Sequence, residues 1–175
     1  MIFISGPSTV GKNPLINAIC EKYNYIYHVP WSSRKIRKEE NGISDYHFVT
    51  KEEFRDKIAD NTIVEWDYAL SNYYGYTMFD ASSEHLITQG LSRMTLRIKK
   101  KNPEKITTVF LMPKNIDNVI NVLHHIYRGK DLCLRLELVE EELLHSRLFD
   151  YIFTVETNSV DLLKDSIFLN ALKLS

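Results

Sequence analysis

The stretch that decides the fold runs from residue 2 to residue 13 and reads Ile2-Phe3-Ile4-Ser5-Gly6-Pro7-Ser8-Thr9-Val10-Gly11-Lys12-Asn13. The apolar run 2–5 predicts a buried strand, and the apolar periodicity of residues 12–23 predicts a helix. Between them lies Gly-x-x-x-x-Gly-Lys, the Walker A pattern, in the strand–loop–helix setting that it requires. The glycines let successive backbone N–H groups turn toward phosphate oxygens, and the helix N-terminus adds a favourable dipole. The sequence therefore predicts a phosphate-binding loop.

This phosphate loop departs from the usual pattern at its end. Lys12 supplies the mobile positive charge for the β- and γ-phosphates of a nucleotide. Asn13 stands where Ser or Thr normally holds Mg²⁺, so its carbonyl oxygen is the candidate metal ligand. Pro14 removes a backbone N–H from the first helical turn. We expect nucleotide binding to survive and affinity or catalysis to be weakened. The residues assigned to the loop are Gly6, Ser8, Thr9, Val10, Gly11, Lys12 and Asn13.

Outward from the loop, strands and helices alternate at both ends of the chain. Apolar runs predict strands over 2–5, 107–112 and 151–155, and helical periodicity predicts helices over 92–101, 116–127, 132–148 and 160–172. This alternation predicts an α/β fold of the P-loop NTPase type, with three α/β/α layers and a mainly parallel sheet. Residues 31–80 are richer in short strands and loops and predict an inserted small lobe that contains β-strands. Within it, Thr50-Lys51-Glu52-Glu53 is a capping box that predicts the start of a helix.

Composition narrows the classes of protein. The 175 residues suit one domain over residues 1–175, and 22 Lys plus Arg against 23 Asp plus Glu give a net charge of −1. That balance argues against a broad nucleic-acid-binding surface. There is no apolar run of about 18 residues and no signal-peptide pattern, so we expect no membrane span and a cytoplasmic protein. Cys20 and Cys133 lie in apolar-periodic stretches and predict two buried free thiols.

Further motifs follow the phosphate loop in a fixed order. With the loop, they resemble the guanylate kinase family over residues 3 to about 155. Singly each motif is weak, but their common order and spacing indicate the family's fold. The motifs are Ser32-Ser33-Arg34-Lys35-Ile36-Arg37, Asp45-Tyr46-His47-Phe48-Val49 with Glu52-Glu53-Phe54, Ile63-Val64-Glu65-Trp66, Asn72-Tyr73-Tyr74-Gly75-Tyr76-Thr77, Arg128-Gly129 and Asp150-Tyr151.

The resemblance implies two nucleotide sites. ATP, with Mg²⁺, would lie on the phosphate loop, and GMP or a related monophosphate would lie in the inserted lobe. Two guanidinium groups suit a phosphate because they form bidentate, charge-assisted bonds, and a carboxylate at Glu65 suits the donor edge of guanine. Lys12, Arg128 and Arg135 would be catalytic, with the two arginines in a lid over residues 124–145 that closes on the transferred group. The implied acceptor residues are Ser33, Arg34, Arg37, Tyr46, Glu65, Tyr74 and Tyr76.

Several positions depart from the family pattern where catalysis would need them. Residues 86–91 hold no carboxylate, His124 replaces the first lid arginine, Val155 replaces an Asn, and the lid is about four residues short. Tyr76 takes the place of a small hydroxyl residue that reads the base. Three hypotheses remain open: a nucleoside monophosphate kinase acting on GMP, a kinase-fold module that binds GMP or a phosphorylated partner without turnover, and a kinase with another acceptor.

Overall fold

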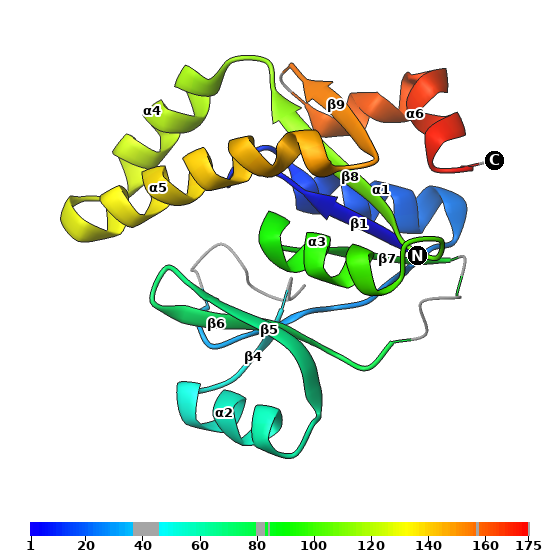
Figure 1. Cartoon of the computed structure of the whole chain (residues 1–175). Helices are drawn as coiled ribbons and strands as arrows, with labels where there is room; N and C mark the ends of the chain where they lie inside the picture. Colours follow the sequence, from blue (N-terminus) through cyan, green and yellow to red (C-terminus); the bar gives the residue numbers. More distant parts are fainter. Residues whose placement is uncertain (37–45, 80–82, 84, 157, 175) are drawn as a thin grey trace. The chain divides into compact units, whose positions relative to one another are not determined.

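Two compact units make up the chain in the computed structural model, which describes residues 1–36, 46–79, 83, 85–156 and 158–174 (Figure 1). The first unit comprises residues 1–27 and 81–175, and the second comprises residues 28–80. The second unit is therefore inserted in the sequence of the first. Arg37, one of the expected acceptor residues, lies outside the described residues.

A five-stranded parallel sheet forms the centre of the first unit. Its order is β2-β7-β1-β8-β9, and every neighbouring pair is parallel. In register, Ile4 lies beside Gln89 on one neighbouring strand and Val109 on the other. Parallel pairing brings the carboxyl ends of these strands to one edge of the sheet. The strands are β1 (Ile2–Ser5), β2 (Ile26–Tyr27), β7 (Leu86–Gln89), β8 (Thr107–Pro113) and β9 (Tyr151–Val155).

Helices cover both faces of this sheet, as the three-layer prediction requires. On one face, Ile2 and Ile4 of β1 share an apolar cluster with Leu15 and Ile16 of α1 (Lys12–Tyr23) and with residues of α6 (Ser166–Ala171). Alternate residues point to the other face, where Ser5 shares a hydrogen bond of 3.0 Å with Thr95 of α3 (Ser92–Lys101). The helix α5 (Gly129–His145) packs on α3 and pairs with α4 (Ile116–Ile126) (Figure 1).

Three sequence predictions for this unit need correction. The single helix expected over 160–172 is a 3-10 helix, η2 (Ser159–Lys164), followed by α6, because Asp165 accepts the N–H groups of Ile167 and Phe168 and starts a new helix. The helix expected from residue 132 begins at Gly129 and ends at His145, followed by the 3-10 turn η1 (Ser146–Leu148). Cys133 is exposed rather than buried, and Cys20 is partly buried.

In its described residues, 28–36 and 46–79, the second unit has a small mixed sheet and one helix. Its strands are β3 (Trp31–Ser32), β4 (His47–Phe48), β5 (Ile63–Ala69) and β6 (Asn72–Thr77), in the order β4-β3-β6-β5. The capping box is confirmed: Thr50 accepts the N–H of Glu53, and the Glu53 carboxylate accepts the N–H of Thr50, at the start of α2 (Lys51–Ala59). Phe54 of α2 is fully buried and stacks on Tyr73 of β6, which fixes the helix on the sheet.

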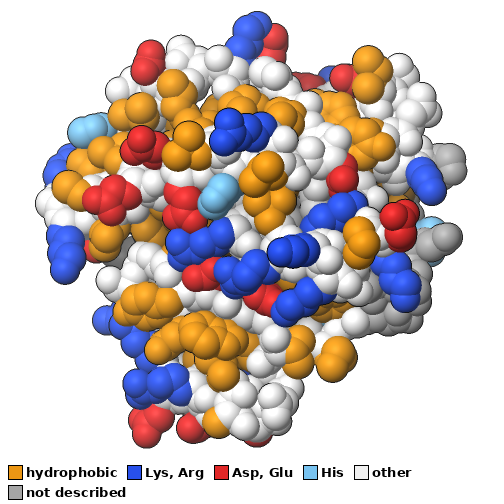
Figure 2. Space-filling model, in the orientation of Figure 1, with side chains coloured by type: hydrophobic (Ala, Val, Ile, Leu, Met, Phe, Trp, Pro, Cys, Tyr) orange, Lys and Arg blue, Asp and Glu red, His pale blue; other side chains and the backbone are white. Residues whose placement is uncertain are grey.

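Charged side chains are mixed over the surface shown in Figure 2, and Lys and Arg gather in a band over α3. In this band, Arg93 pairs with Glu141, and Lys99 pairs with Asp150. Among the residues that the structure describes, no helix is long and apolar enough to span a membrane.

Candidate active site

Two glycines set the path of the phosphate loop. Gly6 has φ +144°, and a Cβ there would lie 2.6 Å from the carbonyl oxygen of Leu111. Gly11 has φ +92°, and a Cβ there would lie 2.5 Å from Oγ of Ser159. Both positions combine left-handed backbone with close contact, so only glycine fits without rearrangement. The loop therefore curls between β1 and α1 as its sequence predicts.

Lys12 lies within this curl. Its Nζ donates to the carbonyl oxygens of Gly6 at 2.6 Å and Pro7 at 2.9 Å, so the ammonium is held against the loop that it belongs to. The hydroxyl of Ser159 donates to the carbonyl oxygen of Gly11 at 2.6 Å and fixes the other end of the loop. The arrangement holds a positive charge at the centre of the loop, where anionic oxygens would bind.

The start of α1 exposes backbone donors and has no competing acid. Gly11 is its N-cap and makes no side-chain capping bond, and the first turn contains no acidic residue. Asn13 and Ser8 are partly exposed, Thr9 is exposed, and Val10 is buried in the apolar core. An uncapped helix N-terminus next to a lysine is a favourable site for phosphate.

Residues 86–91 contain no carboxylate. Gln89, at the end of β7, donates to the hydroxyl of Tyr27 at 3.0 Å. Among the described residues of this unit, Glu142 on α5 is a buried carboxylate: it is 3% exposed and accepts the backbone N–H of Ser92 at 2.8 Å. Burial raises the pKa of Glu142 to about 7, although the Ser92 hydrogen bond and the charge of Lys12 both lower it.

Sequence reasoning missed Glu142, because a glutamate in a helix rich in charged residues is usually exposed. Its burial becomes clear only from its neighbours in the structure. Val139 lies three residues before Glu142 and Ser146 lies four residues after it, and both are buried. Residues at these separations share one helical face, so the pattern places Glu142 on the inward face.

The two expected lid arginines lie in different surroundings. Arg128 donates to the carbonyl oxygens of His124, His125 and Tyr127, so it closes the C-terminal end of α4. Arg135, on α5, lies over the Tyr127 ring with its Cζ 3.7 Å from the ring centre. The structure therefore places Arg128 at the C-terminal end of α4 and Arg135 against the ring of Tyr127.

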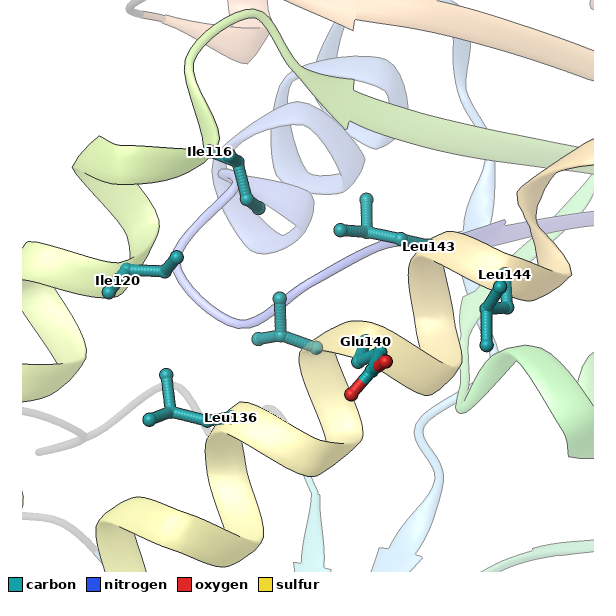
Figure 3. Close-up of a pocket in the computed structure, with 7 residues that line it drawn as sticks. Ile116, Ile120, Leu136, Glu140, Leu143 and Leu144 are labelled. Carbon is teal, nitrogen blue, oxygen red and sulfur yellow. The ribbon is translucent and has the colours of Figure 1, made fainter.

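A cavity of about 500 Å³ separates α4 from α5 (Figure 3). Ile116 and Ile120 of α4 point toward it from one side, and Leu136 and Leu143 of α5 point toward it from the other (Figure 3). Its lining is almost entirely aliphatic, so it offers no groups for phosphate chemistry. Three of its lining residues, Ile116, Leu136 and Leu143, also pack against the buried cluster of Val119, Leu123 and Val139 that joins the two helices.

In the second unit, the structure brings together three of the expected acceptor residues. The Arg34 guanidinium lies 5.1 Å from the Tyr46 ring centre and 4.7 Å from that of Phe48, and the Tyr46 and Tyr74 rings meet edge to face at 5.9 Å. Ser33 accepts the N–H of Tyr73 through its hydroxyl at 2.8 Å, which joins this segment to β6. One guanidinium and two phenol groups thus gather in one place.

Glu65 and Tyr76 lie opposite each other on β5 and β6. Glu65 is 8% exposed, while Tyr76 is fully buried and stacks on His28, with ring centres 6.1 Å apart. Burial, and to a smaller extent the charge of His47, lowers the pKa of His28. The expected acceptor residue Tyr76 therefore lies in the core of this unit beside the imidazole of His28.

The chain is similar to known proteins over most of its length. The guanylate kinase family model matches residues 1–166. The guanylate kinase of Bartonella henselae is 29% identical over 97% of this chain and 80% of its own length, and that of Lactobacillus delbrueckii subsp. bulgaricus is 30% identical over 94% and 85%. The crystal structure of guanylate kinase from Anaplasma phagocytophilum has the same fold, with a TM-score of 0.75 and 21% identity over 100% of this chain and 86% of that one. The chain belongs to the guanylate kinase family.

Proposed function

We propose that the protein transfers the γ-phosphoryl group of ATP to GMP. The observation that carries this proposal is the pair of cationic arrangements, one in each unit: Lys12 at the centre of the phosphate loop, and Arg34 among the phenol groups of Tyr46 and Tyr74. A phosphoryl transfer between two nucleotides needs one such arrangement for the donor and one for the acceptor. A cytoplasmic location is part of the same proposal.

On the donor side, the backbone N–H groups at the start of α1 would bind the phosphates of ATP. The Lys12 ammonium would leave the carbonyl oxygens of Gly6 and Pro7 and bind the β- and γ-phosphates, which are stronger acceptors because they are charged. Its charge would then stabilise the negative charge that develops on the transferred group.

On the acceptor side, Arg34 would bind the phosphate of GMP together with the hydroxyl groups of Tyr46 and Tyr74. The Arg34 side chain is 9% exposed and already held by aromatic rings, so little conformational entropy is lost when it binds a phosphate. Glu65 would accept hydrogen bonds from the donor edge of guanine. An adenine presents a different edge there, and the carboxylate would disfavour it.

The two arginines of the proposed lid would contribute differently to catalysis. Arg135 would stabilise the transferring phosphoryl group from α5, within the proposed lid of residues 124–145. Arg128 would first have to leave the carbonyl oxygens at the end of α4. We therefore assign the larger catalytic part to Arg135.

Enzymes of this family generally use ATP with Mg²⁺. Among the described residues, no three His, Cys, Asp or Glu side chains gather into a metal-binding group. Mg²⁺ on a nucleotide nevertheless keeps several waters and needs few protein oxygens, so the amide oxygen of Asn13, partly exposed beside Lys12, fits one position. When bound, the ion would neutralise charge on the phosphate oxygens.

The test is production of ADP from ATP and Mg²⁺ with each common nucleoside monophosphate in turn. We expect turnover with GMP and much slower turnover with AMP, CMP or UMP. Background rates with every acceptor would overturn the proposal. Calorimetric binding of GMP in the same preparation would then identify a binding module without turnover.

A further inference from the structure

We propose that Glu142 is a positioning residue for the lid helix: with Ser92 and His145 it fixes the end of α5 on α3, and so directs Arg135 toward the phosphate loop. The proposal rests on the proposed function, because it concerns the same transfer. It concerns only the first unit and assigns Glu142 no contact with substrate.

Three neighbouring contacts join the first turn of α3 to the last turns of α5. The Glu142 carboxylate accepts the N–H of Ser92 at 2.8 Å, and the Ser92 hydroxyl shares a hydrogen bond of 2.8 Å with Nδ1 of His145. Arg93 donates from Nη1 to both carboxylate oxygens of Glu141 at 3.0 Å. Three contacts within five residues of α5 hold this end of the helix in one position.

Glu142 also supplies the hydrogen-bond acceptor that α3 lacks at its own N-terminus. The N-cap of α3 is Leu91, whose side chain cannot accept a hydrogen bond, and the first turn contains no acidic residue. Glu142 provides the acceptor from another helix, which satisfies an N–H that would otherwise be buried without a partner. The position of α5 is thereby tied to the position of α3.

One face of α5 carries both this anchor and the lid arginine. Arg135 and Glu142 are seven residues apart, so they lie on the same side of the helix, about 10 Å apart along its axis. Val139, between them on that side, is buried. A rotation of α5 that moved Glu142 would therefore move Arg135 as well.

The anchor lies beside the phosphate loop. Strands β1 and β7 are parallel neighbours, and the N–H of Gly90 donates to the carbonyl oxygen of Ile4 at 3.2 Å. The phosphate loop after β1 and Ser92 after β7 consequently lie at the same edge of the sheet. The charge of Lys12 acts on the Glu142 carboxyl from this loop.

Stability alone does not account for this carboxyl. Its Oε2 is buried and has no hydrogen-bond partner among the described residues. Burial of a carboxyl group with one oxygen unsatisfied costs free energy, and an apolar residue at a helix–helix contact would not incur that cost. The cavity beside α4 is lined by α5 residues from Leu136 to Leu144, so it runs along the same stretch of the helix as Glu142 and takes up none of its oxygens.

The experiment compares Glu142→Ala, Glu142→Gln and the exposed control Glu137→Gln, each alone and with Arg135→Ala. We expect Glu142→Ala to lower kcat by about tenfold with KM for GMP within about twofold. Glu142→Gln keeps an oxygen that accepts from Ser92 and should retain kcat within about threefold, as should Glu137→Gln. When Glu142→Ala is added to Arg135→Ala, kcat should fall by a further factor of less than about three. Both changes remove the same contribution of Arg135 to catalysis.

Multiplicative losses in the double variant, or unchanged kcat in Glu142→Ala, would overturn the proposal. A fall in the kcat of Glu142→Ala that only matches the fall in its folded fraction, measured by thermal unfolding, would also overturn the proposal. Hydrogen exchange separates this proposal from the proposed function. Glu142→Ala should speed amide exchange about tenfold across residues 129–138 and leave residues 51–59 unchanged, whether or not the wild-type protein turns over GMP. Unchanged exchange across 129–138 would also overturn it.

Discussion

The carboxylate of Glu142 and the backbone N–H of Ser92 lie 2.8 Å apart, although fifty residues separate them in the sequence. The bond joins the end of one helix to the start of another at the edge of the sheet where the phosphate loop begins. Burial raises the pKa of this carboxyl group, so the stability of the fold should depend on pH.

We predict that folding stability falls between pH 5 and pH 7 because of Glu142. Burial raises its pKa to about 7 in the folded protein from 4.5, against the effects of Ser92 and Lys12, and Glu141 adds to the rise. Below pH 4.5 the carboxyl is protonated in both states. As pH rises toward 7, only the unfolded chain releases the proton, which favours unfolding by up to about 3 kcal/mol.

The measurement is urea unfolding of the wild type and of Glu142→Gln from pH 5 to pH 8. The difference between the two isolates Glu142 from other groups such as Asp150, whose pKa is lowered by hydrogen bonds from Thr108 and by Lys99 although burial opposes this. We expect the wild type to lose stability relative to the variant as pH rises to 7 and the difference to level off above it. A constant difference would show that Glu142 has an ordinary pKa.

Replacement of Lys12 should remove nucleotide binding at the phosphate loop. Lys12→Met keeps the length of the side chain but removes the charge that lies 2.6 Å from the Gly6 carbonyl oxygen. We expect the affinity for ADP, measured by calorimetry, to fall by about 100-fold, and turnover to fall further because the charge also stabilises the transition state. Lys22→Met, an exposed lysine on the same helix, is the control and should change neither.

The phosphate loop should not accept a Cβ at Gly11. Gly11→Ala combines φ +92° with a Cβ 2.5 Å from Oγ of Ser159, and we expect a loss of about 3 kcal/mol of stability. Gly129→Ala is the matched control, since Gly129 has φ +54° and its Cβ would meet no atom of the described residues within 4 Å. That change should cost about 1 kcal/mol from backbone strain alone. Equal losses in thermal unfolding would mean that Ser159 does not restrict the loop.

Removal of the Arg34 side chain should weaken the binding of GMP and leave the binding of ATP unchanged. Arg34→Ala deletes the guanidinium that lies over the Tyr46 and Phe48 rings, and we expect KM for GMP to rise by about 30-fold, since charge-assisted bonds to phosphate contribute about 2 kcal/mol. KM for ATP should stay within about twofold. Lys35→Ala, its exposed neighbour, should leave both values unchanged. Steady-state kinetics with each substrate varied in turn decide this, and a rise in KM for ATP alone would contradict the assignment.

Local sequence was sufficient where the feature is made by contiguous residues. The phosphate loop follows from residues 2–13 because the backbone path depends on where glycine permits left-handed φ, and both Gly6 and Gly11 adopt it. The capping box at Thr50 and Glu53 is equally local. Apolar runs likewise predicted strands β1 and β8, whose residues are buried on both faces of the sheet, and the edge strand β9, in which Phe153 and Val155 are buried.

The local sequence did not predict helix boundaries that are set by side-chain hydrogen bonds. Asp165 accepts two N–H groups and breaks the helix expected over 160–172 into two. Arg128 caps α4, so α5 begins at Gly129, three residues earlier than apolar periodicity indicates. Periodicity reports which residues are apolar, but polar bonds at helix ends fix the boundaries.

The sequence by itself determined the phosphate loop, the alternating α/β order and the membership of the family, because each depends on residue types at short, fixed spacings. Only the tertiary structure decided that Glu142 meets Ser92, that Arg34 lies among Tyr46 and Phe48, and that Cys133 is exposed. These outcomes depend on which helix faces and strand edges meet after residues far apart in the chain pack together. Burial and neighbouring charge, which give Glu142 its raised pKa, exist only in that packed state.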